Sequence, residues 1–142
     1  MHLVAGEVMK PALIDTDILS MFLRGHPVVR ENFKHYLKAY NNINISIISH
    51  YEILSGLKHK DAHKQLSSFL EFASLSNILP LTTQSSENAS IIYADLCKKG
   101  TPVDDIDLLI AGIAQENNMM VITNNTSHFE RIECIEIANW SK

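Results

Sequence analysis

Residues 100–115 read GTPVDDIDLLIAGIAQ, a Gly-x-Pro turn followed by three aspartates and an apolar segment. Apolar residues recur here at i, i+3, i+4 and i+7, which predicts a helix with one face in a core. That face is expected to consist of Ile106, Leu109, Ile110 and Ile113. Asp104, Asp105 and Asp107 would then lie at the start of a rigid helix. Aspartates at a helix start also serve as N-caps and complement the helix dipole, so this segment alone does not establish a functional site.

On both sides of this segment, β-branched runs alternate with amphipathic runs. This alternation predicts an α/β fold with a mostly parallel central sheet of about four to five strands flanked by helices. The expected strands are residues 11–14, 43–48, 78–81, 119–122 and 133–137. The other expected helices are residues 18–23, 28–40, 49–58, 62–75 and 88–99, and Trp140 is expected to pack on the body. Residues 1–10 have no clear period and are expected to form an accessory or loosely ordered end.

Composition limits the class of protein. With 142 residues and 46% apolar content, residues 1–142 are expected to form a single globular domain. No apolar run is long enough for a membrane span, so a cytoplasmic protein with no membrane association is expected. Cys97 and Cys134 are then expected to be buried free thiols rather than a disulfide. The net charge of −4 argues against a general polyanion-binding surface. It leaves nucleic acid open, because acids gathered at one metal site contribute to that total.

Polar side chains follow several of the predicted strands. Asp15 follows residues 11–14, and Asn124 and Asn125 follow residues 119–122. Because the carboxyl ends of parallel strands meet at one edge of a sheet, where ligands bind, these side chains are expected to converge. Glu52 can reach the same edge. Each acid also has a structural alternative, since Asp15 can cap a helix and Glu52 can close an S-x-x-E capping box that begins at Ser49.

Carboxylates brought this close together would repel one another. At about 4 Å, each pair costs roughly 1 kcal/mol in water and roughly 4 kcal/mol at an effective dielectric constant of 20. A bound cation removes that cost. Oxygen ligands without neighbouring cysteines or clustered histidines favour Mg²⁺ or Mn²⁺ over Zn²⁺. Such an ion bridges phosphate oxygens and activates water, so the pattern predicts phosphodiester or phosphoryl chemistry without naming a substrate.

Four segments in order resemble the PIN-domain ribonucleases, and within that superfamily they are most similar to VapC toxins of type II toxin–antitoxin systems. These segments are ALIDTD (12–17), SIISHYEILSG (46–56), GTPVDDIDLLIA (100–111) and VITNN (121–125), the last followed by FERI (129–132). The resemblance extends from about residue 11 to Trp140. It implies a PIN-like fold and an endoribonuclease that depends on Mg²⁺, or on Mn²⁺, and inhibits translation by cutting RNA, with tRNA among the family's substrates. It also implies a cognate VapB-type antitoxin and a homodimer.

The resemblance also implies roles for individual residues. Asp15 and Asp107 match the aspartates that ligate the metal, whereas Glu52 and Asp105 match further acids of the family. The expected site therefore comprises Asp15, Glu52, Asp105, Asp107, Thr123 and Asn125. Asn124 or Asn125 stands where many relatives have a fourth acid, so the number of bound ions stays open. Which of Glu52 and Asp105 handles the attacking water also stays open.

Two other functions fit parts of the sequence. The strand–Asp–Thr–Asp start is similar to that of haloacid-dehalogenase-like phosphatases, but those enzymes have Gly-Thr where Ile18 and Leu19 stand here. The second alternative is a catalytically inactive PIN-like module that binds RNA or a partner. The presence of Asp15, Glu52 and Asp107 argues against an inactive module.

Overall fold

The structure is a computed structural model that describes residues 10–142. The predicted accessory segment, residues 1–10, lies outside the described residues apart from Lys10. Within the described part of the chain, no helix has both the length and the apolar character needed to cross a membrane.

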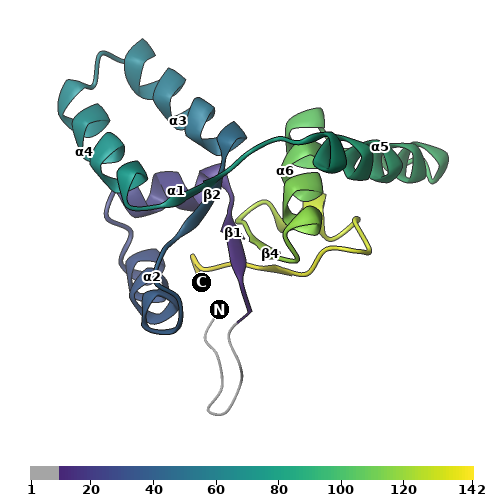
Figure 1. The fold of residues 1–142 in the computed structure, drawn as a ribbon, viewed down its shortest axis with the longest axis horizontal. Helices are drawn as coiled ribbons and strands as arrows, with labels where there is room; N and C mark the ends of the chain where they lie inside the picture. The colour runs from purple at the N-terminus through teal and green to yellow at the C-terminus, as the bar shows by residue number, and fades with distance from the viewer. Residues whose placement is uncertain (1–9) are drawn as a thin grey trace.

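Five parallel strands form one sheet in the order β3-β2-β1-β4-β5. Figure 1 labels three of them, β2, β1 and β4. The strands are β1 (Ala12–Ile14), β2 (Asn44–Ser46), β3 (Asn77–Leu79), β4 (Met120–Ile122) and β5 (Ile137–Ala138). The central strand β1 pairs with β2 on one side and with β4 on the other, with Leu13 opposite Asn44 and Val121. The predicted α/β fold with a parallel sheet is confirmed.

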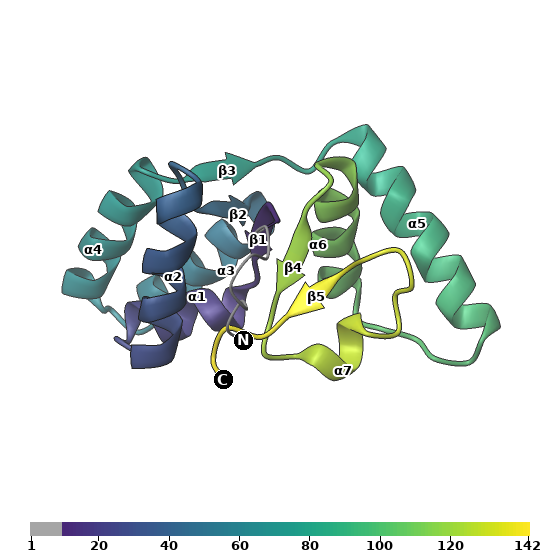
Figure 2. The same cartoon turned by 90° about the horizontal axis from the view of Figure 1, so that it is seen from below.

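Helices cover both faces of the sheet. They are α1 (Thr16–Leu23), α2 (Pro27–Ala39), α3 (Ile47–His59), α4 (His63–Ser74), α5 (Thr83–Lys98), α6 (Asp105–Glu116) and α7 (Thr126–Phe129). Figure 2 shows α1 to α4 on one side of the sheet and α5 and α6 on the other. The result is a three-layer arrangement with the strands in the middle.

The alternation of side chains along the central strand supplies two separate cores. Ala12 and Ile14 point into the cluster formed with α1 to α4, whereas Leu13 points into the cluster formed with α5 and α6. Trp140 joins the first core, as predicted, and lies 5.7 Å from Phe33 between ring centroids. The central strand β1 therefore buries both faces, which explains why its sequence is apolar without interruption.

The strand predicted over residues 43–48 is too long at its end. Strand β2 ends at Ser46, and Ser46 itself is the N-cap of α3, because its hydroxyl accepts a hydrogen bond from the Ser49 backbone N–H at 3.0 Å. The predicted capping box from Ser49 to Glu52 is therefore wrong. In the sequence, either Ser46 or Ser49 could cap a helix. Ser46 is the N-cap because it is the last residue of β2, directly before α3.

Two predictions about buried residues are also wrong. On α6, Ile106 is 36% exposed, and the buried face centres on Leu108, Ile110 and Ile113. Ile106 lies in the first turn, before α6 reaches full contact with the sheet. Cys97 and Cys134 are free, as predicted, but both are exposed. Cys97 lies on α5 away from the sheet, and Cys134 lies in the irregular segment before β5.

Other element bounds differ from the sequence prediction. Helix α5 begins at Thr83 rather than at residue 88, because Thr82 and Ser85 form a capping box within the polar segment. The last strand is only Ile137–Ala138, and residues 133–136 approach it without strand structure. The segment after β4, where the sequence predicts no helix, contains the one-turn helix α7.

Candidate active site

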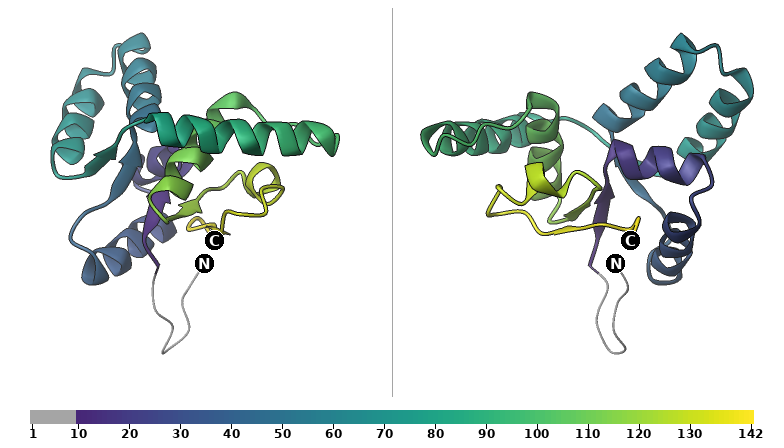
Figure 3. Two further views of the ribbon diagram at one scale, coloured as in Figure 1. Left: turned by 45° about the vertical axis from the view of Figure 1, so that its right-hand side comes forward. Right: turned by 180° about the vertical axis from the view of Figure 1, so that it is seen from behind.

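Asp15 lies at the carboxyl end of β1, directly before α1. The right-hand view of Figure 3 shows the purple ribbon of β1 leading directly into α1. It is 5% exposed. Its Oδ1 accepts a hydrogen bond from the Thr16 backbone N–H at 2.8 Å, so Asp15 is the N-cap of α1. Its Oδ2 accepts a hydrogen bond from the Thr123 hydroxyl at 2.8 Å. Thr123 follows β4, the neighbouring strand, so two adjacent strand ends meet at this carboxylate.

Three aspartates influence one another at this edge. Burial, followed by the charge of Asp17 and more weakly that of Asp107, raises the pKa of Asp15 to about 7. Burial also raises the pKa of Asp17, and the charge of Asp107 adds to that rise. Asp17 is held by hydrogen bonds from the backbone N–H groups of Ile18 at 2.7 Å and Asn124 at 3.0 Å. The site therefore concentrates negative charge where little water is present to screen it.

Asp107 lies in the first turn of α6 with 15% of its side chain exposed. Its Oδ2 lies 2.9 Å from Nδ1 of His128, a residue of α7. The same ring nitrogen lies 2.7 Å from the side-chain amide of Asn125. The backbone N–H of Asn125 donates to the Thr123 hydroxyl at 2.9 Å. Hydrogen bonds from the segment after β4 therefore reach both Asp15 and Asp107.

Glu52 approaches the same edge from α3. The hydroxyl of Thr16 donates to its Oε1 at 2.6 Å and lies 2.8 Å from the Ser49 hydroxyl. Thr16 is the residue after Asp15, so Glu52 is connected to the site through the start of α1. Glu52 is thus engaged with α1 instead of capping its own helix.

The other acids of the 100–115 segment lie differently. Asp104 is the N-cap of α6 and accepts a hydrogen bond from the Ile106 backbone N–H at 3.2 Å. Asp105 is exposed, and its charge acts on Tyr93 of α5, where it adds to the effect of Cys97 in raising the Tyr93 pKa. No contact within the described residues joins Asp105 to Asp15 or Asp107.

Sequence reasoning missed two residues at this edge, Asp17 and His128. Asp17 is not among the expected site residues, although its position two residues after Asp15 places both acids in the turn that opens α1. His128 was not singled out at all. Its spacing of three residues from Asn125 was the available signal, since residues three apart lie on the same side of a helical turn.

The donors present fit a hard divalent cation. Around Asp15 they are carboxylate and hydroxyl oxygens, which suit Mg²⁺ or Mn²⁺. Burial first, and then the charge of Asp17, raises the pKa of Asp15, and a bound cation would stabilise its ionised form. Among residues 10–142, no three His, Cys, Asp or Glu side chains are close enough to form a complete metal cage. Mg²⁺ does not need one, because it commonly binds through one or two carboxylates and completes its shell with water and substrate phosphate.

A separate hollow of about 270 Å³ lies at the other end of the strands, where Lys10, Met120 and Glu136 contribute to its lining. It contains none of the site residues. The candidate chemistry is therefore concentrated at the carboxyl edge of the sheet, where parallel α/β folds bind their ligands.

Comparison with known proteins gives a consistent family. The family model described as PIN domain matches residues 12–133. The tRNA(fMet)-specific endonuclease VapC of Salmonella typhimurium is 33% identical over 135 residues, which cover 90% of this chain and 96% of the relative. Ribonuclease VapC2 of Rickettsia felis is 30% identical over 131 residues, which cover 92% of this chain and 98% of the relative.

Solved structures agree with the sequence relatives. The crystal structure of DNA-bound VapBC from Salmonella typhimurium contains a chain with a TM-score of 0.83 and 32% identity, covering 93% of this chain and 99% of that one. The structure of VapBC2 from Rickettsia felis bound to a promoter DNA fragment gives a TM-score of 0.81 and 28% identity, with coverage of 91% and 98%.

Proposed function

Because the chain belongs to the PIN domain family and, within it, to the VapC ribonucleases, we propose that it is a metal-dependent endoribonuclease and the toxin of a type II toxin–antitoxin pair. One observation carries the proposal. The carboxylates of Asp15 and Asp107, which come from opposite halves of the chain, are both tied to the segment after β4 at one edge of the sheet.

PIN-domain nucleases generally depend on a divalent metal ion. We propose Mg²⁺, with Mn²⁺ as a substitute, held by Asp15 and Asp107. When bound, the ion supplies charge neutralisation at the scissile phosphate and lowers the pKa of water. The oxygen-only donors around Asp15 and the raised pKa of its carboxyl group support this assignment.

The remaining residues act on orientation and on protons. Thr123 holds Asp15 by donating to its Oδ2, which fixes the direction of the carboxylate. Asn125 supports Thr123 from its backbone N–H. Glu52, fixed by the Thr16 hydroxyl, is proposed to orient the attacking water or accept its proton. The role of Asp105 stays a prediction, since its charge acts on α5.

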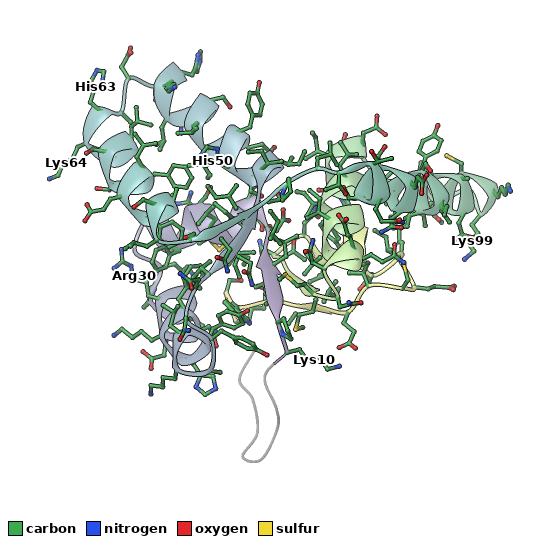
Figure 4. All side chains as sticks on the ribbon, in the orientation of Figure 1. Lys10, Arg30, His50, His63, Lys64 and Lys99 are labelled. Atoms are coloured by element: carbon green, nitrogen blue, oxygen red, sulfur yellow. The ribbon has the colours of Figure 1, made fainter. Side chains whose placement is uncertain are left out.

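RNA is the proposed substrate, and tRNA is the first class to test because a relative is named for cleavage of tRNA(fMet). The labelled basic residues lie at separate parts of the molecule, with His63 and Lys64 at α4 and Lys99 at the far end of α5 (Figure 4). RNA binding therefore cannot depend on these residues as one basic patch.

The proposed protein partners are a VapB-type antitoxin and a second copy of the chain. Structures of related proteins are VapBC complexes. Several large apolar side chains are exposed on this chain, and exposed apolar surface marks interaction sites. Those with at least half of their surface exposed are Tyr51, Leu75, Ile91 and Tyr93.

Cleavage of total RNA and of purified tRNA tests the proposal. The chain should cut RNA with Mg²⁺ and stop when EDTA is added, and the cognate VapB-type antitoxin should inhibit it. Asp15→Asn and Asp107→Asn should each reduce cleavage by at least about 100-fold, with an unchanged circular dichroism spectrum, because each removes a charged ligand. Asp61→Asn, at an exposed turn, is the matched control.

Two results would contradict the proposal. RNA cleavage that persists in EDTA would show that the activity does not depend on a metal ion. Full activity of Asp15→Asn and Asp107→Asn would show that these two residues are not its ligands. RNA binding without cleavage in any divalent ion would instead favour the inactive RNA-binding module.

A further inference from the structure

A continuous hydrogen-bonded path joins the two carboxylates of the site. Thr123 donates its hydroxyl to Asp15 and accepts the backbone N–H of Asn125 at 2.9 Å. The Asn125 side chain lies 2.7 Å from Nδ1 of His128, and that nitrogen lies 2.9 Å from Oδ2 of Asp107. Every link between Asp15 and Asp107 belongs to the short segment from Thr123 to His128. This segment therefore sets how the two acids are oriented.

We propose that His128 is a positioning residue for Asp107 and that its ring increases the affinity of the site for a divalent ion. This inference rests on the proposed function, because it assumes that Asp107 ligates the metal. The ring engages Oδ2 of Asp107, and within residues 10–142 the other oxygen, Oδ1, has no hydrogen-bond partner. His128 thus fixes one oxygen and leaves the other for the ion.

The direction of the hydrogen bond follows from the acceptor. An ionised carboxylate only accepts, so Nδ1 of His128 carries the proton and donates to Asp107. The structure places Nδ2 of Asn125 against the same ring nitrogen. Because that nitrogen carries the proton, the Asn125 amide is assigned the opposite way, so that its oxygen accepts from the ring. The two amide atoms exchange by a half turn of the side chain, and their assignment follows the hydrogen-bond network. Asn125 and Asp107 together therefore hold the ring in one tautomer.

The expected effect has a general basis. Side chains that hydrogen-bond a metal-ligating group restrict its rotamers, and their loss commonly weakens metal binding by about 10–100-fold. Asp107 is mostly buried, whereas the His128 side chain is 41% exposed and packs from outside. Substitution of His128 therefore changes the orientation of Asp107 without opening the core.

A matched pair of substitutions separates hydrogen bonding from packing. His128→Leu and His128→Asn introduce side chains of nearly the same shape, but only asparagine keeps an N–H near the position of Nδ1. The measurement is Mn²⁺ binding by the full chain, followed through the electron paramagnetic resonance signal of free Mn²⁺. His63→Leu, at the exposed start of α4, is the histidine control.

The proposal expects His128→Leu to raise the Mn²⁺ dissociation constant by about 10–100-fold, His128→Asn to recover most of the affinity, and His63→Leu to change nothing. Unchanged binding by His128→Leu would overturn it. Equal losses in both His128 variants would also overturn it, because they would assign the effect to ring packing. Asp107→Asn is titrated alongside. If Asp107→Asn binds Mn²⁺ normally, Asp107 is not a metal ligand and the proposed function is contradicted at that residue. If Asp107→Asn loses Mn²⁺ binding but His128→Leu binds normally, only the positioning role of His128 is contradicted.

A second measurement decides the case if His128→Leu does not fold. The measurement is the nuclear magnetic resonance spectrum of the histidine rings. The ring signals of His128 in the unchanged chain are identified because they are missing from the spectrum of His128→Asn. Addition of Mg²⁺ should shift these signals and leave those of His63 in place, because of these two histidines only His128 contacts a proposed ligand of the ion. Signals of His128 that do not move at saturating Mg²⁺ would overturn the proposal.

Discussion

At Asp15 a local role in the fold coincides with a role in the proposed site. Its carboxylate caps α1, a role that stabilises proteins by about 1 kcal/mol. The same carboxylate is buried beside Asp17, which raises its pKa to about 7 and makes the ionised form costly. In the absence of a metal ion, this residue should therefore lower the stability of the fold at neutral and higher pH.

The pH dependence of stability tests this cost. The folded pKa of about 7 lies above the ordinary value of 3.8, so the folded chain retains a proton that the unfolded chain has released. The free energy of unfolding should fall as pH rises between about 4 and 7 and the loss should be complete above pH 8. In the unchanged chain this fall in the free energy of unfolding should be on the order of 2–4 kcal/mol, and Asp15→Asn should abolish it. The measurement is urea unfolding in EDTA.

Asp61→Asn, at an exposed position, is the control and should keep the pH dependence of the unchanged chain. If Asp15→Asn and the unchanged chain lose the same stability between pH 5 and pH 8, Asp15 is not the residue that retains the proton.

The sequence reveals some of these residues and not others for a physical reason. Asp15 and Thr123 follow apolar strands directly, so a parallel sheet brings them to the same edge, and the structure places them in contact. His128 gives no comparable signal, since its role depends on where α7 turns after β4. A histidine in a short polar segment is equally compatible with solvent exposure, and only the three-dimensional structure distinguishes the two.

At the scale of elements, strand and helix types were predictable and several bounds were not. The isoleucine-rich segment from Ile43 to Ile48 suggests one long strand, but the ladder to its neighbours ends at Ser46. Ile47 and Ile48 then belong to α3, where Ile47 is 40% exposed. β-Branched residues favour strands only weakly, and a well-placed N-cap together with the limit of sheet pairing decides the boundary.

Helices α5 and α6 pack together at a point where only glycine fits. A Cβ added to Gly112 would lie 2.3 Å from the backbone oxygen of Ser85 and 3.1 Å from Ala89. Gly112→Ala should therefore destabilise the chain by about 1–3 kcal/mol, because the two helices must move apart to accept it. The measurement is the midpoint of urea or thermal unfolding.

Gly56→Ala provides the matched control. Gly56 lies within α3, and a Cβ there would have nothing within 4 Å. This substitution should stabilise the chain by about 0.5–1 kcal/mol, because alanine loses less backbone entropy than glycine in a helix. If Gly112→Ala also stabilises the chain, the close approach of α5 and α6 is not the constraint on Gly112.

At the scale of the whole molecule, the site lies where the order of the strands reverses. From β1 the chain adds β2 and β3 on one side, then returns to place β4 and β5 on the other. Asp15 and Thr123 follow the two strands on either side of this reversal, which is the usual position of ligand sites in open α/β sheets. This general rule, rather than any single motif, made the location predictable.

The proposed homodimer predicts self-association. A monomer has a mass of 16.0 kDa, and the chain should elute with about twice that mass in light scattering at micromolar concentration. Substitution of an exposed apolar residue such as Ile91 with lysine reports whether α5 takes part, with Asp61→Asn as the neutral reference. A monomeric mass at every concentration would contradict the proposed homodimer.

The position of β4 beside β1 has a consequence for synthesis. Protein chains leave the ribosome from the amino terminus, and the first half of this one contributes Asp15 and Glu52 without Asp107, Thr123 or His128. The proposed site is therefore incomplete in the nascent polypeptide until the residues up to His128 have been synthesised and β4 has paired with β1. A chain built in this order is expected to bind the metal ion and to cleave RNA only after that point in translation.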